Sequence, residues 1–366
     1  MNRTHLPVLL LCVLLALANC APTPTALPPT AIPATPAPTM PPTAIASPTP
    51  MPTATALAPD TWHQVMPGAG LCTDTPALLG QVYVGTTSNT LCYPDDAAGL
   101  WPSGGTGAWT ALTLPEGTYP TGASRFPPGG GVLITTQSGQ CVNMGGPELD
   151  CQSTAEGFPH AGIRAIATLG TEPVYLFGDS VAYLDLVYRV PDVLGAEDAH
   201  ATTLAVSRER GEDPEIWIGT NGYGILVVRP LSGTTDHYTT AEGLPSDTIR
   251  DLSTGGEYCP KSCPDLIDVW VATDRGAGHW DGRTWRTYTS GDNLPADDVR
   301  AISSAATGSA YAVTGGGPAR FDGAQWFALP QPTDIAPERI LDVAAGQTEV
   351  WFSTLQAGLL VYTPAP

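Results

Sequence analysis

Short apolar stretches recur along the chain, each with an aromatic or large apolar residue at its second position. These second positions are 50, 42, 42, 53, 41 and 40 residues apart, a spacing typical of one supersecondary unit copied many times. Each stretch has the length and β-branched or aromatic content of a strand and leads into a turn. The copies lie at residues 82–86, 132–136, 174–178, 216–220, 269–273, 310–314 and 350–354.

The clearest unit, residues 243–289, shows what one copy contains. Four short strand-like stretches are separated by tight turns, one of which is Asp281-Gly282, a strong hairpin signal. Four short antiparallel strands form one propeller blade. Seven copies of the second strand therefore predict an all-β fold, a seven-bladed β-propeller with four-stranded antiparallel blades.

The two ends of the domain complement each other. The last unit has three strand-like stretches, whereas Thr61-Trp62-His63-Gln64-Val65 precedes the first complete unit. Trp62 has the place that Trp285 and Trp326 have in the outer strands of their units. We therefore expect this N-terminal strand to pair with residues 358–362 and complete the last blade, which would leave no open sheet edge at the seam.

The unit resembles the two-component regulator propeller repeat. That pattern has a Leu-Pro entry, an alternating first strand, a Trp-Ile-Gly-Thr strand, a Gly-rich turn and an aromatic outer strand, as in residues 216–223, 243–289 and 294–329. The resemblance implies a sensing domain of the kind found outside the cell in bacterial hybrid sensor proteins, where glycans are common signals. This chain carries no kinase or receiver domain, so signalling would need a partner.

The N-terminus resembles an export signal. Arg3 precedes an apolar run that is too short to span a bilayer and ends in Leu17-Ala18-Asn19-Cys20, which resembles a bacterial lipobox, although Asn19 departs from its usual residue. The sequence predicts a signal at 1–20 with lipidation of Cys20. The alternative is ordinary cleavage after Ala18, which also exports the protein.

Residues 21–59 consist almost wholly of Pro, Thr and Ala and contain no charge. Such a segment cannot bury a core and predicts a disordered, polyproline-like linker, which at ~3.1 Å per residue would reach on the order of 100 Å. The propeller domain is then expected at residues 60–366.

Six cysteines remain in the predicted domain, and an exported protein favours disulfides. Six cysteines allow 15 pairings, but proximity in sequence favours local bridges. A zinc site is the alternative for the closest pair, but no second Cys or His pair has ligand spacing, so no metal is expected. The predicted pairs are Cys141–Cys151, Cys259–Cys263 and, by elimination, Cys72–Cys92.

Three arginines, Arg164, Arg250 and Arg300, share one place early in the first strand of their units. First strands line a propeller's central channel, so the three could form a basic rim for an anionic or sugar ligand. The alternative is an ion pair or backbone hydrogen bond to the adjacent blade, with Asp251, Asp297 or Asp298 as partners.

Two Gly-flanked turns add candidate ligand contacts. Tyr223 lies in the Asn221-Gly222-Tyr223-Gly224 turn, and Asp274 and Arg275 lie in the corresponding turn of the next unit. The aromatic residues of the recurring stretches themselves are expected to pack between blades.

Charge and motifs narrow the function. A formal charge of −20, with Lys261 the only lysine, argues against binding nucleic acid or an anionic lipid surface. The sequence has no nucleophile elbow, zinc-protease motif or phosphate-binding loop, and no cofactor is expected. It therefore predicts a lipid-anchored, monomeric, non-catalytic module on the outer face of the cell membrane that binds or senses an extracellular glycan or protein.

Two other functions stay open. A polysaccharide lyase or glycosidase of propeller fold would show a converged cluster of His, Tyr, Arg and carboxylate at one mouth of the channel. A structural scaffold for protein interactions would show flat and charged faces.

Overall fold

The computed structural model describes most of the predicted domain. Every described residue lies in the unit Met51–Pro366. The predicted signal, Cys20 and the 21–59 linker lie outside the described residues. Within the described part of the chain, no helix has the length and hydropathy of a membrane span. The described residues are 61–65, 77–78, 84–85, 90–94, 109–126, 131–143, 149–169, 172–207, 213–255, 268–305, 308–330, 335–346, 349–355 and 358–364.

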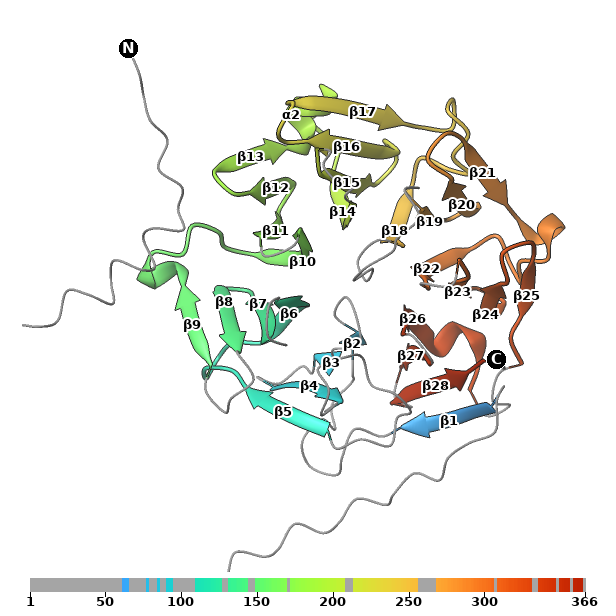
Figure 1. Ribbon diagram of the computed structural model, residues 1–366, viewed down its shortest axis with the longest axis horizontal. Coiled ribbons are helices and arrows are strands. Elements are labelled where there is room, and N and C mark those ends of the chain that lie inside the picture. Colours follow the sequence, from blue (N-terminus) through green and yellow to red (C-terminus); the bar gives the residue numbers. More distant parts are fainter. Residues whose placement is uncertain are drawn as a thin grey trace, which may run out of the picture. The chain divides into compact units, whose positions relative to one another are not determined.

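Six complete four-stranded antiparallel blades follow one another around a common axis, with the first strand of each nearest the axis (Figure 1). The first three are β6 (Pro120–Phe126), β7 (Gly131–Thr136), β8 (Gly139–Asn143) and β9 (Asp150–Ser153); β10 (Ile163–Leu169), β11 (Glu172–Phe177), β12 (Ser180–Tyr183) and β13 (Leu186–Arg189); and β14 (Ala201–Ser207), β15 (Glu215–Thr220), β16 (Ile225–Arg229) and β17 (Thr234–Tyr238).

The next two blades and the closing blade continue the same order. They are β18 (Ile249–Thr254), β19 (Val269–Thr273), β20 (Gly276–Trp280) and β21 (Trp285–Tyr288); β22 (Val299–Ser304), β23 (Ala310–Thr314), β24 (Gly317–Phe321) and β25 (Trp326–Ala328); and β26 (Ile340–Ala345), β27 (Val350–Thr354), β28 (Leu359–Thr363) and β1 (Thr61–Val65).

The expectation of seven full blades is corrected to six among the described residues. A further, much shorter sheet lies between β26–β27 and β6. Its first two strands have two residues each, too few for the strand-to-strand packing that the other blades show. The stretch from 66 to 108 is rich in Gly, Pro and Asp, which weaken strand pairing. This sheet contains β2 (Ala77–Leu78), β3 (Val84–Gly85), β4 (Thr90–Pro94) and β5 (Trp109–Thr113).

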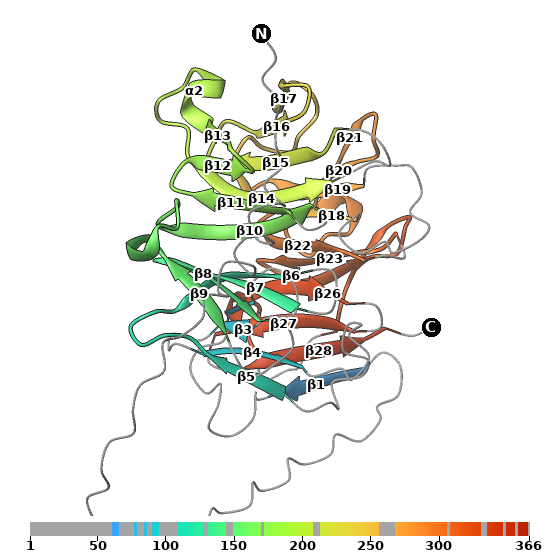
Figure 2. The ribbon, with the colours of Figure 1, turned by 60° about the vertical axis from the view of Figure 1, so that its left-hand side comes forward.

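The predicted closure by the N-terminal strand is confirmed. β1 lies beside β28 (Figures 1 and 2) and pairs with it antiparallel, with Trp62 opposite Tyr362. The Trp62 ring centroid is 5.2 Å from that of Phe352 and 5.1 Å from that of Tyr362. The last blade is thus built from both ends of the domain.

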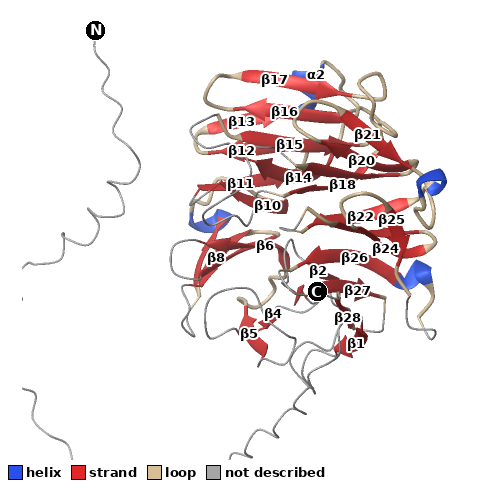
Figure 3. Cartoon of the chain, turned by 45° about the vertical axis from the view of Figure 1, so that its right-hand side comes forward, coloured by secondary structure: helices blue, strands red, loops and turns tan. Residues whose placement is uncertain are grey.

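Helices are confined to the connections between strands (Figure 3). The one described α-helix, α2 (Val190–Leu194), follows β13 and ends at Gly195 with a φ of 66°, a left-handed conformation that suits glycine. The 3₁₀ turns are η1 (Thr154–Glu156), η2 (Ser290–Asp292) and η3 (Pro337–Arg339).

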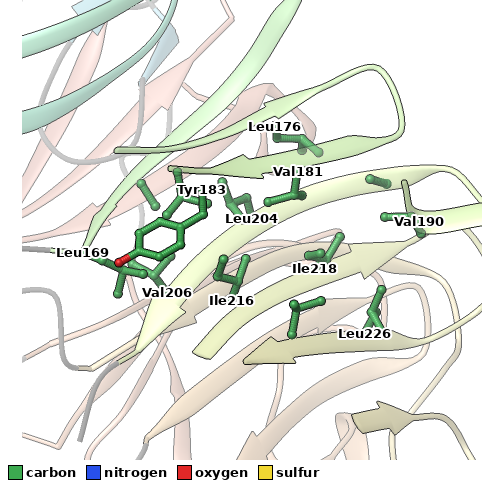
Figure 4. Close-up of a cluster of buried hydrophobic side chains, with 14 of the residues drawn as sticks. Leu169, Leu176, Val181, Tyr183, Val190, Leu204, Val206, Ile216, Ile218 and Leu226 are labelled. Carbon is green, nitrogen blue, oxygen red and sulfur yellow. The ribbon is translucent and has the colours of Figure 1, made fainter. Parts of the chain in front are cut away.

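Apolar side chains of neighbouring blades pack against each other. In Figure 4, Leu176, Val181 and Tyr183 lie against Leu204, Ile216, Ile218 and Leu226 of the next blade. The aromatics of the recurring stretches belong to this core, as expected: Trp217, Trp270 and Trp351 are each 1% exposed. Burial of such side chains contributes about 25 cal/mol per Å² of apolar surface. The aromatics therefore hold blades together and are not available to a ligand.

Blades approach one another closely at Gly219 in β15. A Cβ at this position would lie 2.5 Å from a methyl carbon of Ile249 and 2.6 Å from one of Thr203. The glycine of the Trp-Ile-Gly-Thr motif is therefore required by the contact between two blades.

A β-bulge recurs near the start of the inner strand in all six complete blades, where the register with the second strand shifts. A bulge leaves one residue without a partner and turns its side chain in a new direction. The extra residues are Thr121, Arg164, Thr202, Arg250, Arg300 and Leu341.

Three successive bulge side chains bond to the next blade. Arg164 Nη2 donates to the carbonyl of Ala201 (2.6 Å), Thr202 Oγ1 to that of Ile249 (2.8 Å), and Arg250 Nη1 to that of Val299 (3.3 Å). Each acceptor is the first residue of the neighbouring inner strand. The bulge therefore serves as a repeated link between blades.

Candidate functional site

One face of the ring gathers the irregular parts of the repeat. Because the first and second strands are antiparallel, each inner strand begins at the face where its second strand ends and turns into the third. We call this the entry face. Its turns are closed by a threonine hydroxyl that donates to a glycine carbonyl at 2.7 Å, in the pairs Thr220–Gly224, Thr273–Gly276, Thr314–Gly317 and Thr354–Gly358.

A histidine and an aspartate meet on the entry face. Asp179 lies in the turn after β11, and His200 precedes β14 of the next blade. His200 Nδ1 is 3.0 Å from Asp179 Oδ2, and the side chains are 57% and 32% exposed. The backbone N–H of His200 donates to Asn221 Oδ1 (2.7 Å). Nε2 has no partner among the described residues and faces a solvent-exposed surface.

Tyr223 adds an aromatic ring to the same blade junction. Its hydroxyl donates to Asp198 Oδ1, which raises the pKa of Tyr223 and lowers that of Asp198. His237 Nε2 donates to the backbone carbonyl of Tyr223 (2.6 Å). We call Asp179, Asp198, His200, Asn221 and Tyr223 the His200 cluster.

Arg164 borders this cluster. Its Nη2 donates to the carbonyls of Gly178 (2.8 Å) and Ala201 (2.6 Å), the residues next to Asp179 and His200. Arg164 thus helps to fix the turn that carries Asp179 and the strand that follows His200. The remaining guanidinium N–H groups lie on an exposed side chain.

The other two predicted arginines meet at one carboxylate. Arg250 Nη1 is 2.5 Å from Asp298 Oδ1, and Arg300 Nε is 3.1 Å from Oδ2. The hydrogen bond from Arg250 is the largest cause of the lowered pKa of Asp298. Arg164 and Arg250 therefore make the contacts of the alternative interpretation, to the adjacent blade, whereas Arg300 pairs with a carboxylate two residues before it. Ligand binding by these arginines stays a prediction.

Asp274 and Arg275 lie in the turn after β19. Arg275 is exposed, and its backbone N–H donates to Thr273 Oγ1 (3.1 Å). Asp274 Oδ1 is buried without a hydrogen-bond partner among the described residues. The structure does not bring this turn into a contact with the His200 cluster.

Two carboxylates stand nearer the axis, each following the bulge of its inner strand. Asp251 accepts from the backbone N–H of Leu252 (2.8 Å) and, across the blade junction, of Ile302 (2.9 Å). Burial raises the pKa of Asp251 to about 6. Burial and then the charge of Asp251 raise the pKa of Asp342 to about 7. The other four complete blades have Gly122, Ala165, Thr203 or Ala301 at the same position.

Of the predicted disulfides, Cys141–Cys151 is formed, between directly opposite residues of β8 and β9. Cys72, Cys259 and Cys263 lie outside the described residues, as does the side chain of Cys92. Within the described ranges, no group of three His, Cys, Asp or Glu side chains is placed to hold a metal ion.

The sequence pointed to Tyr223 and Arg164 but missed His200, Asp179 and Asp198. The histidines have no repeated partner in sequence, because the partner of His200 belongs to another blade. The predicted blade topology could have indicated the pair. Asp179 follows the second strand of one blade and His200 precedes the first strand of the next, and both of these positions lie on the entry face.

Comparisons with known proteins support the fold. No family model and no curated protein matches the chain. Among solved structures, virginiamycin B lyase from Staphylococcus aureus is 11% identical with a TM-score of 0.58, covering 84% of this chain and 99% of that chain. YCF48 from Cyanidioschyzon merolae is 12% identical with a TM-score of 0.53, covering 83% and 98%.

A third similar structure is the extracellular domain of a one-component system from B. thetaiotaomicron. It is 13% identical with a TM-score of 0.54, covering 82% of this chain and 40% of that one. At these identities the likeness concerns the fold alone. The comparisons therefore establish that the domain has a β-propeller fold, which it shares with a lyase and with the extracellular domain of a one-component system.

Proposed function

We propose that this chain is an exported, surface-tethered β-propeller that binds an extracellular glycan or protein as a monomer without transforming it. The ligand would contact the entry face at the His200 cluster. Residues 1–20 would be an export signal lipidated at Cys20, residues 21–59 the tether, and residues 60–366 the binding domain, outside the cell membrane.

The observation that carries this proposal is the departure of one blade junction from the repeat. Only here, among the described residues, do an exposed histidine, a tyrosine and two aspartates come together on the entry face. Asn221 Oδ1 and Asp179 Oδ2 are used within the cluster, which fixes the orientation of His200. Polar groups held in place beside an aromatic ring suit a ligand rich in hydroxyl or amide groups.

The test is a glycan array followed by affinity measurements with the full chain. Tyr223→Ala and His200→Ala should each weaken binding of a hit about tenfold or more, which corresponds to about 1.4 kcal/mol. Tyr119→Ala is the matched control, because Tyr119 is 48% exposed before β6, away from the cluster. Equal affinities for all three variants and the unaltered chain would refute the placement of the site.

A second function is favoured by the same geometry. A histidine oriented by a carboxylate, with its other nitrogen free, is the arrangement of a general base. Together with Tyr223, Arg164 and Asp198 it fits a lyase or glycosidase acting on an extracellular polysaccharide. This function would be favoured over simple binding if the protein cleaves a glycan found on the array, and if His200→Gln abolishes cleavage but not binding.

A further inference from the structure

Exposed apolar side chains are concentrated on one hairpin at the periphery of the ring. Of the nine large hydrophobic residues exposed in the described part of the chain, four fall within ten consecutive residues. They are Leu184 (56%), Leu186 (42%), Val187 (56%) and Val193 (37%). They belong to the turn between β12 and β13, to β13 and to α2, and we call them the hairpin patch. Leu184 lies at the end of its blade opposite Asp179, whereas α2 begins next to the His200 cluster, where the N–H of Val190 donates to the carbonyl of Asp179 (2.9 Å).

The backbone at the tip of this hairpin is strained. Leu184 has a φ of 53°, a left-handed conformation that costs free energy for any residue with a Cβ. The corresponding turns of three other blades contain Gly233, Gly282 or Gly323, all with positive φ. An exposed leucine at this position stabilises neither the turn nor the core. A leucine at this position is explained if its side chain contacts a partner molecule.

The neighbouring strand offers a free sheet edge. β13 pairs only with β12, with Tyr183 opposite Leu186 and Ala182 opposite Val187. A two-residue turn makes Tyr183 and Leu186 a hydrogen-bonded pair, so the N–H and C=O groups of Val187 and Arg189 point away from β12. Val187 has no other backbone partner among the described residues. Arg189 is the N-cap of α2, and its C=O accepts the first hydrogen bond of that helix, so only its N–H is available to an added strand.

Two other outer strands protect such an edge with polar residues, whereas β25 exposes Phe327 and Ala328. The exposed positions of β17 carry Thr234, Thr235 and His237, and those of β21 carry Arg286 and Thr287. Polar and charged side chains discourage the addition of a further strand. β13 lacks this protection at Leu186 and Val187.

The charges around the hairpin patch restrict which segments can pair with β13. Asp185, Asp192 and Glu197 surround it, and the one nearby cation, Arg189, is already paired with Asp192 (2.5 Å) and Glu197 (3.1 Å). The remaining charge is negative. α2 begins at Val190, directly after β13, so the free edge is four residues long. An occupant therefore needs backbone groups, apolar side chains and positive charge within a short segment.

We propose that β13 is a docking edge at which a short extended segment of a partner protein, with alternating apolar and basic residues, adds as a fifth strand. Backbone hydrogen bonds to Val187 and Arg189 would supply affinity, and the hairpin patch would receive the apolar side chains. Leu184 would close over the end of the added strand. This docking edge is a different surface from the ligand site on the entry face, which it adjoins at Val190.

The probe is a capped six-residue peptide of alternating valine and lysine with a fluorescent label, titrated with the full chain. The control peptide has the same sequence but is N-methylated at alternate amides. It keeps the charge and lacks the N–H donors along one edge of the strand. We expect the first peptide to bind with a dissociation constant on the order of 100 μM and the control peptide at least tenfold more weakly. Equal binding of both peptides would overturn the proposal, because it would mean charge attraction alone.

Two variants locate the site on the chain. Val187→Pro removes an outward N–H without breaking a bond to β12 and should weaken binding at least fivefold. Leu184→Asn suits the positive φ, so it should raise the midpoint of thermal unfolding while weakening peptide binding. The matched control is Leu231→Asn, because Leu231 is 68% exposed outside the patch.

Each outcome is decisive. If Val187→Pro and Leu184→Asn both fold and bind the peptide as well as the unaltered chain does, β13 is not the edge. If the variants instead reduce binding to phosphatidylcholine vesicles and leave peptide binding unchanged, the patch is a lipid contact and the proposal is wrong.

Discussion

Replacing Trp62 tests whether the ring is energetically closed by its N-terminal strand. The indole lies partly buried on β1, against Phe352 and Tyr362 at 5.2 and 5.1 Å. No other side chain of β1 is described, so Trp62 is the visible anchor of the seam. Trp62→Ala removes both aromatic contacts and leaves the backbone pairing with β28 in place.

The expected loss follows from these contacts. Truncating a fully buried aromatic costs about 3–5 kcal/mol, and an aromatic pair adds about 0.5–1.5 kcal/mol beyond buried area. Because Trp62 keeps part of its surface exposed, we expect Trp62→Ala to lower the free energy of unfolding by about 2–3 kcal/mol. Trp62 Nε1 is buried without a hydrogen-bond partner among the described residues. Trp62→Phe therefore loses no hydrogen bond seen in the structure and should lower the free energy of unfolding by at most about 1 kcal/mol.

Urea denaturation and amide hydrogen exchange measure the effect. Exchange in β28 should accelerate in Trp62→Ala before exchange in β15 or β19 changes, because β28 then pairs with a loosened edge. Phe327→Ala is the control, since Phe327 lies on an outer strand and is 43% exposed; it should change stability by at most about 0.5 kcal/mol. Unchanged stability and unchanged protection of β28 in Trp62→Ala would refute the reasoning.

Three further changes probe the ring. Burial raises the pKa of Asp251 to about 6, and burial together with the charge of Asp251 raises that of Asp342 to about 7, so the folded state holds protons that the unfolded state has released. The free energy of unfolding should therefore fall as pH rises from about 4 to about 7. Asp342→Asn should flatten this dependence in urea titrations and stabilise the protein by on the order of 2 kcal/mol at pH 8 but little at pH 4; an unchanged slope contradicts it. Replacing Cys141 and Cys151 together by serine opens a link with a sequence separation of 10 and should cost about 3 kcal/mol in non-reducing buffer, with no difference expected under reducing conditions. Gly219→Ala would place a Cβ 2.5 Å from a methyl carbon of the next blade; a loss of at least 1 kcal/mol in thermal unfolding is expected, and a neutral effect would show that the blades can separate.

Features of the repeat were predictable from sequence because they depend on local pattern. The aromatics at Trp217 and Trp270 are buried as expected, and Trp62 was placed correctly because it matches other outer strands. The blade count was wrong since a matching motif at 82–86 does not guarantee full strands when its flanks favour turns.

The candidate site was predictable only in part because it depends on contacts between blades. The bulge at Arg164 turns its side chain toward the carbonyl of Ala201 in the next blade. The local sequence does not indicate this direction. The pairing of His200 with Asp179 likewise joins two different repeats. An alignment of repeats matches equivalent positions of different blades. It does not show which non-equivalent positions come into contact between two neighbouring blades.

The pairing of β1 with β28 also orders events during synthesis. β1 is the first strand of the domain to leave the ribosome and the last to find its partner, because β28 is about 300 residues away in the chain. Contacts so distant in sequence slow folding, and until β28 is made, β1 presents an unpaired edge that can join other chains. A protein closed in this way is safest if it stays unfolded, or bound by a chaperone, until its whole length is available, as the export proposed above would allow.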